Sequence, residues 1–319
     1  MTDLWYALLL LVITLFLIEY LRRRLTVGGY RDKYVLVTGC DSGFGQRLTT
    51  RLDNLGFKVF AGCLTEDGRQ YLSKSCSKNV VPFLLDVRSN ESIQSALDLV
   101  KQNLPKDIGL WGLVNNAGIV GNMAVSELCS KSDYLACFDV NLFGLIEMTR
   151  TFLPLLRRSK GRVVNTSSLL ARLAIFAPVY TLSKCGVEVY SDFQTKTNSR
   201  LCFVRREMYS KGIQVSIIEP GAFKTPIFNY DTMTKAVQQA YDSASEEVQS
   251  LYSGFVSKYR QMMEGLGKSP NIDLVVDAYI HALTSQFPKA RYAPSHDSSL
   301  LNIPLSYLPT WYTDWLKQY

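Results

Sequence analysis

The sequence predicts an α/β protein built on one doubly wound parallel sheet, with helices on both faces of the sheet. Short apolar runs bounded by turn residues alternate with segments of helical periodicity, which is the pattern of consecutive βαβ units. The apolar runs are continuous rather than alternating, as is typical of strands that are covered on both faces. The chain has 319 residues, 47% of them hydrophobic, so it can bury one large core in a single domain.

Seven apolar runs are expected to form strands, and four longer stretches are expected to form helices. The strands are predicted at residues 34–38, 58–62, 80–85, 110–115, 162–166, 214–218 and, with a weaker pattern, 291–293. The helices are predicted at residues 44–55, 92–103, 132–158 and 179–210. No internal repeat or low-complexity tract divides this region, so we expect residues 30–293 to form one domain.

Residues 1–24 are expected to be an N-terminal membrane anchor with a basic flank. Residues 4–18 carry no charge and the apolar character resumes after Glu19, which gives a helix of roughly 27 Å, close to the thickness of a bilayer core. The arginines at 22–24 predict that the rest of the chain stays on the cytosolic side. A cleavable signal peptide fits poorly, because basic residues follow the apolar run and no small-x-small site is present. The alternative is a helix that lies on the membrane surface.

The remaining composition argues against several classes of function. The net charge of +7 is scattered outside that basic flank, so no nucleic-acid surface is predicted. Seven widely spaced cysteines without a C-x-x-C pair, and only two histidines, support neither a zinc site nor a disulfide framework. Sequons occur at Asn90 and Asn165, and the second lies in a run expected to be a buried strand, which favours a cytosolic domain.

Two segments late in the chain differ from the alternating pattern. Residues 226–266 are rich in Ser, Gln, Met, Tyr and Glu and have helical periodicity without a strand. We interpret them as a helical lid over a substrate pocket, the alternative being a surface excursion. Residues 294–319 are apolar and aromatic, but Pro304 and Pro309 prevent a straight spanning helix. This segment is expected to pack on the lid or to enter the bilayer interface.

A glycine-rich loop, T-G-C-D-S-G-F-G at residues 38–45, follows the first predicted strand and opens the first predicted helix of the domain. In this context the glycines predict a Rossmann-type phosphate site, because the helix N-terminus offers free N–H groups to a pyrophosphate. Gly39 would permit the tight turn, Gly43 the close approach of backbone to the pyrophosphate, and Gly45 close packing of helix on strand. The alternative is a glycine-rich turn without a ligand. The cofactor contacts predicted in the loop are Gly39, Ser42, Gly43, Phe44 and Gly45.

The choice between NAD and NADP is predicted from charge near the loop. Asp41 would repel a 2′-phosphate, and no basic residue occurs in the loop before Arg47, which favours NAD. The acidic residue that usually ends the second strand is missing, because Cys63 stands there. NADP is therefore kept as the alternative.

Tyr180 and Lys184 are four residues apart in a predicted helix, so both side chains project from one face. A free tyrosine has a pKa of about 10, and a neighbouring ammonium favours the phenolate, so the pair could supply a base. Ser168 follows a predicted strand 12 residues before Tyr180, and its hydroxyl could bind the oxygen of an alcohol substrate. The alternative is an ordinary pair on a helix surface.

Taken together, the motifs resemble the short-chain dehydrogenase/reductase family and, within it, the microsomal retinol and hydroxysteroid dehydrogenases. The likeness runs from about residue 34 to the C-terminus, and an N-terminal anchor is also usual in those enzymes. Besides the glycine loop, it is carried by L-D-V at 85–87, L-W-G-L-V-N-N-A-G at 110–118, V-N-L-F-G at 140–144, G-R-V-V-N-T-S-S at 161–168 and I-E-P-G-A-F-K-T at 218–225.

The resemblance implies a role for each matching residue. Tyr180 would be the acid/base, Lys184 would lower its pKa and bind the nicotinamide ribose, and Ser168 matches the family's serine. Asn141 would complete the tetrad by holding a water that links Lys184 to solvent, the alternative being a purely local role in its helix. The implied cofactor contacts are Asp86 and Val87 at the adenine, Asn115, Ala117 and Gly118 along the groove, and Pro220, Gly221, Phe223 and Thr225 at the nicotinamide.

Two stretches depart from the family pattern. Residues 175–179, I-F-A-P-V, replace a small glycine-rich run, so the pocket wall should be bulkier. Residues 194–203 look like about ten extra residues in the helix that carries Tyr180, roughly 2.8 turns, and are expected to bulge out as a loop. The family pairs through this helix, so the insert could alter the packing of a homodimer.

These inferences predict an enzyme of the endoplasmic reticulum membrane with a cytosolic catalytic domain. The expected reaction is NAD-dependent oxidation of a lipophilic alcohol, either retinol to retinal or a 3α- or 17β-hydroxysteroid to a ketosteroid. An anchor, a lid rich in methionine and aromatic residues, and a bulky pocket wall suit an apolar substrate. No residue decides between retinoid and steroid. The alternatives are an NADPH-dependent carbonyl reductase and a catalytically silent membrane scaffold.

Overall fold

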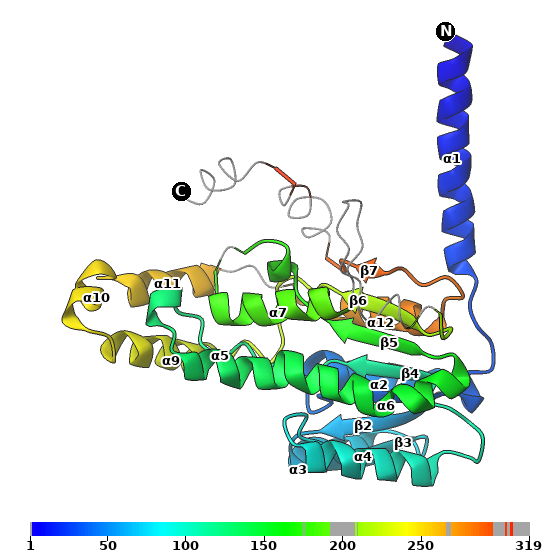
Figure 1. Cartoon of the computed structure of the whole chain (residues 1–319), viewed down its shortest axis with the longest axis horizontal. Coiled ribbons are helices and arrows are strands. Elements are labelled where there is room, and N and C mark those ends of the chain that lie inside the picture. The colour runs from blue at the N-terminus through cyan, green and yellow to red at the C-terminus, as the bar shows by residue number, and fades with distance from the viewer. Residues whose placement is uncertain are drawn as a thin grey trace.

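A single parallel sheet forms the centre of the protein in a computed structural model, which describes residues 2–174, 176–191, 208, 210–265, 269–295, 304, 307 and 308 (Figure 1). Within these residues seven strands pair in the order β3-β2-β1-β4-β5-β6-β7, and every pair is parallel. The strands are β1 Tyr34–Thr38, β2 Lys58–Cys63, β3 Val80–Leu84, β4 Gly112–Asn115, β5 Arg162–Thr166, β6 Gln214–Ile218 and β7 Arg291–Tyr292. All seven predicted strands are confirmed, with ends that differ by no more than two residues.

Helices cover both faces of this sheet. Val35 and Val37 point into one hydrophobic core and Leu36, between them, points into another, as the alternation of a strand requires. The first core is closed by α2 Gly43–Asn54, α3 Glu66–Ser75 and α12 Asp273–Thr284. The second is closed mainly by α4 Asn90–Asn103 and α6 Leu145–Ser159, with α7 Pro178–Ser191 lying beside β5 and β6. The predicted doubly wound sheet is therefore confirmed.

The order of the strands reverses between β1 and β4. From β1 the sheet grows through β2 to β3 in one direction, and from β4 through β5 to β7 in the other. In open parallel sheets, ligands bind in the crevice that forms outside the carboxyl ends of the strands at such a point. The glycine loop begins at the carboxyl end of β1, so the fold places it at this crevice.

Several helices differ from the prediction. The helices α3 and α12 were not predicted; α3 is a mostly polar segment that buries only Gly68 and Leu72 and begins at the capping residue Thr65. The long helix predicted at 132–158 is interrupted, because α5 Lys131–Phe138 and α6 are joined by a π-helical turn, Asp139–Gly144. The predicted helix 179–210 corresponds to α7 as far as Ser191, and the extra residues 194–203 lie outside the described residues.

The N-terminal helix α1, Thr2–Arg24, stands clear of the domain (Figure 1). Its apolar side chains are exposed, and the segment Trp5–Arg24 has a mean hydropathy of 1.8 in its most apolar window, so it is long and apolar enough to cross a membrane. The last turn carries the three arginines of the basic flank.

The end of α1 is attached to the domain through the segment that follows α12. The carbonyl oxygen of Arg23 lies 3.0 Å from Nε2 of His281 and accepts a hydrogen bond of 3.1 Å from the Ser285 hydroxyl. The Gln286 amide donates to the Leu25 carbonyl at 2.7 Å. These bonds fix the position at which α1 leaves the domain.

The helices α9 Tyr230–Asp242, α10 Glu246–Leu251 and α11 Phe255–Gly265 extend beyond one end of the sheet (Figure 1). They enclose a third hydrophobic cluster, separate from the two cores of the sheet. We call it the lid cluster; its buried members are Met123, Ala124, Leu128, Ala177, Met233, Val237, Tyr259 and Met263. The helical character predicted for 226–266 is confirmed, whereas most of the predicted C-terminal segment 294–319 lies outside the described residues.

Candidate active site

The glycine loop follows a path that favours glycine at two positions. Gly39 and Gly43 have φ angles of 69° and 59°, in the left-handed region. A Cβ at Gly39 would lie 2.8 Å from the Cα of Ala117, and a Cβ at Gly45 would overlap the carbonyl oxygen of Gly39. Gly45 therefore lets the first turn of α2 pack directly against the loop, as predicted.

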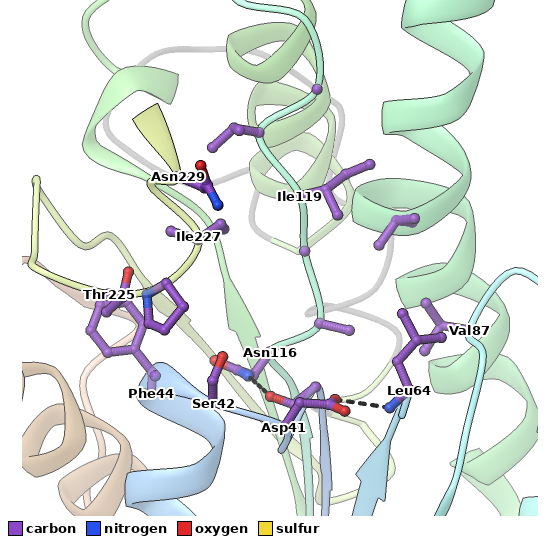
Figure 2. A pocket seen from close by; sticks show the side chains of 18 of the residues that line it. Asp41, Ser42, Phe44, Leu64, Val87, Asn116, Ile119, Thr225, Ile227 and Asn229 are labelled. Atoms are coloured by element: carbon purple, nitrogen blue, oxygen red, sulfur yellow. Dashed lines mark hydrogen bonds between the residues drawn. The ribbon is translucent and has the colours of Figure 1, made fainter. Parts of the chain in front are cut away.

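A pocket of about 610 Å³ opens at the carboxyl ends of β1 and β4, beside this loop (Figure 2). Ser42, at the N-cap of α2, makes no capping hydrogen bond through its side chain within the described chain, so the N–H groups of the first turn face the pocket side without that partner. Of the predicted cofactor contacts, those that line the pocket are Gly39, Ser42, Gly43, Phe44, Asp86, Val87, Ala117, Gly118 and Thr225. The shape and the exposed helix N-terminus fit a dinucleotide.

Adjacent asparagines at the end of β4 have different positions. Asn115 is buried in the sheet, where its Nδ2 donates to Asn165 Oδ1 at 2.8 Å and Thr149 Oγ1 at 3.0 Å. Asn116 instead lines the pocket, and its Nδ2 donates to the carbonyl oxygens of Thr38 and Gly39 (Figure 2). The prediction that Asn115 lines the groove is thus wrong, while its predicted contribution to the sheet agrees with these bonds. The alternation of side chains along β4 could have identified Asn116.

Asp41 ties the glycine loop to the end of β2. Its carboxylate accepts hydrogen bonds from the Leu64 and Thr65 amides, both at 2.8 Å, and from the Thr65 hydroxyl at 2.7 Å. The side chain reaches from the pocket wall toward Leu64 in Figure 2. An acidic group is thereby held at the wall of the pocket, in a fixed orientation.

A second charged pair lines the same pocket. Arg88, which was not predicted, binds the carboxylate of Asp86 through Nε at 2.9 Å and Nη2 at 2.6 Å. Hydrogen bonding from Arg88 holds the pKa of Asp86 below its ordinary value. The one cation in this wall of the pocket is therefore paired with a neighbouring carboxylate among the described residues.

Tyr180 and Lys184 lie on α7, with the lysine Nζ 5.7 Å from the centre of the tyrosine ring. Lys184 is buried and donates a hydrogen bond of 2.9 Å to the Thr166 carbonyl at the end of β5. Burial lowers the pKa of Lys184 to about 8. Burial also raises the pKa of Tyr180 to about 12, although a hydrogen bond with Ser168 opposes this. The expectation that Lys184 brings the pKa of Tyr180 below its usual value stays a prediction, and burial acts in the opposite direction.

Asn141 occupies the π-helical turn between α5 and α6. Its Oδ1 accepts from the Ile119 amide at 2.8 Å, and its Nδ2 donates to the Ile119 carbonyl and the Ser183 hydroxyl, both at 2.9 Å. A Cβ at Gly118 would lie 3.2 Å from Asn141 Oδ1 and 3.4 Å from Lys184 Nζ. Gly118 also lines the pocket, so this glycine joins the pocket to the two buried polar groups.

The segment after β6 closes the other side of the pocket. The Leu169 amide, next to Ser168, donates to the Pro220 carbonyl at 3.0 Å. Phe223 is buried and packs edge to face against Phe44, with ring centres 5.7 Å apart. Thr225 lies over the glycine loop, since a Cβ at Gly43 would be 3.5 Å from its Cβ. Within the described chain the pocket is not lined by the other predicted cofactor contacts, Gly45, Asn115, Tyr180, Lys184, Pro220, Gly221 and Phe223, nor by the predicted catalytic residues Asn141 and Ser168.

Tyr180 packs against the lid cluster. Tyr180 and Phe176 are partly buried against the methionines and aromatic side chains of α9 and α11. Phe176 and Ala177 belong to the bulky stretch predicted at 175–179, of which residue 175 lies outside the described residues. Ala177 has a left-handed φ of 54° and is buried. Tyr180 thus packs against an apolar cluster while its hydroxyl is hydrogen-bonded to Ser168.

Comparisons with known proteins agree with this geometry. A family model described as short chain dehydrogenase matches residues 33–236. Retinol dehydrogenase 7 of Rattus norvegicus is 42% identical over 313 residues, which are 97% of this chain and 95% of that protein. The 17-beta-hydroxysteroid dehydrogenase type 6 of the same organism is 40% identical over 317 residues, which are 98% of this chain and 96% of that protein.

Solved structures also match the fold. A short-chain dehydrogenase from Streptomyces avermitilis has a TM-score of 0.66 and 25% identity, covering 89% of this chain and 97% of its own. A Burkholderia cenocepacia short chain dehydrogenase in complex with NADP has a TM-score of 0.66 and 20% identity over the same shares of the two chains. A 3-ketoacyl-(acyl-carrier-protein) reductase from Brucella melitensis complexed with NADH has a TM-score of 0.62 and 19% identity, covering 82% of this chain and 96% of its own.

Proposed function

This chain belongs to the short-chain dehydrogenase family, and from that premise we propose that it oxidises a lipophilic alcohol, a retinol or a 3α- or 17β-hydroxysteroid, with NAD. It is an oxidoreductase that acts on CH–OH groups with a nicotinamide cofactor. One observation carries the proposal. Gly118 lines the dinucleotide pocket and lies against Asn141 and Lys184, so the pocket leads directly to the helix that bears Tyr180.

Tyr180 is proposed to remove the proton from the substrate hydroxyl, and Ser168 to hold the same oxygen by a hydrogen bond. Lys184 contributes a positive charge beside the tyrosine ring and is held in place by the Thr166 carbonyl. A bound oxidised nicotinamide supplies the acceptor of the hydride. Because the pKa of Tyr180 lies above its usual value, the rate of oxidation should rise with pH as more of the phenolate forms.

NAD is the proposed cofactor because the charges at the pocket wall disfavour a 2′-phosphate. Asp41 is fixed there by the amides of Leu64 and Thr65, and the charge of Arg88 is already paired with Asp86. A ligand that binds only the folded state raises the melting temperature of the protein, and the rise grows with the ratio of ligand concentration to Kd. NAD should therefore raise the melting temperature more than an equal concentration of NADP, and Asp41→Asn should narrow the difference. A larger shift with NADP would contradict this choice.

The lid cluster supports an apolar substrate. Its methionines and aromatic side chains face Tyr180, and methionine adapts to irregular apolar ligands. The relatives at about 40% identity carry the names of retinol and hydroxysteroid dehydrogenases, and both substrates are lipophilic alcohols. The exposed apolar helix α1 supports a membrane location from which such a substrate would be drawn.

The proposed location is the endoplasmic reticulum membrane, with the catalytic domain in the cytosol. The arginines at the end of α1 support this orientation. A homodimer through α5 and α7 is supported by exposed apolar side chains on these elements and the turn between α5 and α6, namely Leu135, Phe143, Leu182 and Val189, each about half exposed. Chemical crosslinking of the chain in membranes would test the dimer.

The decisive experiment compares the wild type with Tyr180→Phe, supplying NAD with all-trans-retinol and with androstanediol. Loss of the acid/base should reduce turnover by about 10²- to 10⁴-fold. Tyr71→Phe, at an exposed tyrosine on α3, is the matched control and should keep full activity. If the wild type converts none of these alcohols, or if Tyr180→Phe converts them as fast, the proposal fails and a silent scaffold is favoured.

A carbonyl reductase is the second candidate, and one observation favours it. Burial raises the pKa of Tyr180 to about 12, which keeps the phenol protonated at neutral pH, and carbonyl reduction needs this protonated form. Measuring both directions with retinal and retinol at neutral pH separates the two. Faster reduction with NADPH than oxidation with NAD would favour the reductase.

A further inference from the structure

Within the described residues, four charged side chains form a network around the buried carboxylate of Glu219, next to the proposed catalytic residues. Arg172 binds Glu219 through two parallel hydrogen bonds, Nε to Oε2 at 2.8 Å and Nη2 to Oε1 at 3.0 Å. Arg291 contacts Glu219 as well, and its Nη1 donates to Glu188 Oε2 at 2.8 Å. The carboxylate of Glu219 is 1% exposed and that of Glu188 is 12% exposed. Among the described residues, the network has two positive and two negative groups.

Three of the four members belong to segments that carry part of the proposed site, and Arg291 lies in the edge strand β7. Arg172 follows Ser168 after a single 3-10 turn, Leu169–Ala171. Glu219 ends β6 directly before Pro220, whose carbonyl receives the Leu169 amide. Glu188 lies one helical turn after Lys184 on α7, and its Oε1 is 3.1 Å from the Ser167 hydroxyl.

Hydrophobic packing alone could have closed this region without charges. Removing charges from water is costly, and apolar residues of similar size are often at least as stabilising as a buried ion pair. What an ion network adds is direction, because a bidentate guanidinium–carboxylate pair fixes both distance and angle. Here the pair links the loop after Ser168 to the end of β6, and Arg291 links both to α7.

We propose that the network of Arg172, Glu219, Arg291 and Glu188 is a positioning device that holds Ser168 and the segment after β6 in register with Tyr180. This inference rests on the proposed function, since it assigns a purpose to the network within that reaction. In the proposed reaction the four side chains act through Ser168 and α7, to which they are linked, and not on the substrate itself.

A displaced Ser168 has two consequences that can be measured. The hydroxyl would leave the position at which it binds the substrate oxygen, and a misplacement of about 1 Å can cost on the order of 10²-fold in rate. The hydrogen bond that opposes the rise in the pKa of Tyr180 would also weaken. The acid limb of the pH profile for oxidation should then move to higher pH.

The experiment uses the full chain and compares Arg172→Met, Arg172→Lys and Arg47→Met with the wild type. Arg47 is the matched control, because it binds Asp273 through the same bidentate geometry, at 2.9 and 3.0 Å, but on the exposed surface. Turnover, KM for NAD, the pH profile and amide hydrogen exchange are measured for each. Exchange is followed in the peptides around Leu169, whose amide bonds to Pro220.

Arg172→Met should lower kcat by about tenfold to 10²-fold while KM for NAD stays within about twofold. It should move the acid limb of the pH profile to higher pH. It should also speed amide hydrogen exchange at Leu169 more than in the strands of the sheet. Arg172→Lys should fall between this variant and the wild type, because it restores the charge but not the bidentate geometry. Arg47→Met should match the wild type in all four measurements.

A folded Arg172→Met that melts earlier but keeps the kcat, the pH profile and the exchange of the wild type would overturn the inference. If Arg172→Met does not fold, Arg172→Lys decides by the same criteria. A wild type without alcohol oxidation would overturn the proposed function instead. Amide hydrogen exchange can be measured without any turnover. Even in that case, unchanged exchange at Leu169 in the Arg172 variants would overturn the positioning role.

Discussion

The pocket beside the glycine loop and the lid cluster meet at Met233, which lines the pocket and is buried in the cluster, yet different forces hold the two regions together. The pocket is fixed by hydrogen bonds at defined atoms, such as those from Asn116 to the Gly39 carbonyl and from the Thr65 amide to Asp41. The lid cluster is held by contacts among methionine, valine and tyrosine side chains, which have no required partner. A region built from hydrogen bonds tolerates almost no change in shape, whereas a region built from dispersion contacts can adapt to its ligand.

The largest effect is expected where the pocket has no room. Gly45→Ala would push a methyl group into the Gly39 carbonyl and to within 2.6 Å of Asn116 Nδ2. Overpacking against backbone typically costs 1–3 kcal/mol, so we expect a loss of about 3 kcal/mol in the free energy of unfolding, with weaker binding of NAD. Chemical denaturation and cofactor titration measure the two.

Gly28→Ala is the control for that change, because a Cβ at Gly28 meets nothing within 4 Å. Its unfolding free energy should stay within about 0.5 kcal/mol of the wild type. Equal losses in the two variants would show that the tight approach at Gly45 contributes little, and the contrast between pocket and lid would weaken.

A smaller effect is expected at Lys184, which lies behind Gly118 of the pocket wall. Burial lowers the pKa of this lysine from 10.5 to about 8, so the unfolded chain binds more protons than the folded chain between these values. Stability should therefore rise with pH across this window, and below about pH 8 the charged lysine destabilises the fold. The free energy of unfolding of Lys184→Met should exceed that of the wild type by about 1–3 kcal/mol at pH 7, since one pKa unit corresponds to about 1.4 kcal/mol. The same variant should lose its activity.

The extra stability of Lys184→Met over the wild type should shrink as the pH rises from 8 toward 10.5. Measuring the free energy of unfolding of both proteins at several pH values will detect this. Lys258→Met, on the exposed face of lid helix α11, should leave the dependence on pH unchanged. A Lys184→Met variant that is less stable at pH 7 would mean that the bond to the Thr166 carbonyl outweighs the cost of burying the charge.

The smallest effect is expected in the lid cluster. Ala177 has a φ of 54°, a conformation that costs a residue with a Cβ about 1 kcal/mol, and Ala177→Gly would relieve it. The lost methyl and the added backbone freedom offset this gain, so its stability should stay within about 1 kcal/mol of the wild type. Ala124→Gly, also buried in the cluster but without a left-handed φ, should lose about 1 kcal/mol or more. Thermal melting compares the stability of the two variants. Equal losses of stability in Ala177→Gly and Ala124→Gly would contradict the backbone strain at Ala177.

The sequence was sufficient for features that depend on neighbours along the chain. Each strand is a local apolar run, and the glycine loop is a local pattern in which Gly39 makes a left-handed turn and Gly45 allows close packing of α2. The helix α3 was missed because its sequence is mostly polar and its helix depends on the Thr65 cap and on packing against β2 and β3.

Features that depend on partners far apart in the sequence could not be predicted. The network of Arg172 and Glu219 joins residues 47 positions apart, and no local pattern marks either one as buried. The same holds for the pKa of Tyr180. Spacing placed Lys184 near it, but the degree of burial, which decides the direction of the shift, comes from the packing of the lid cluster.

The hydrogen bonds from His281 and Ser285 to the Arg23 carbonyl couple the orientation of α1 to that of the domain. In the proposed membrane, such a helix tilts to match the thickness of the bilayer, and the domain must tilt with it. The height and angle of the pocket above the lipid would then vary with bilayer composition. The access of an alcohol dissolved in the bilayer to Tyr180 would then depend on the thickness of the membrane as well as on the residues of the protein.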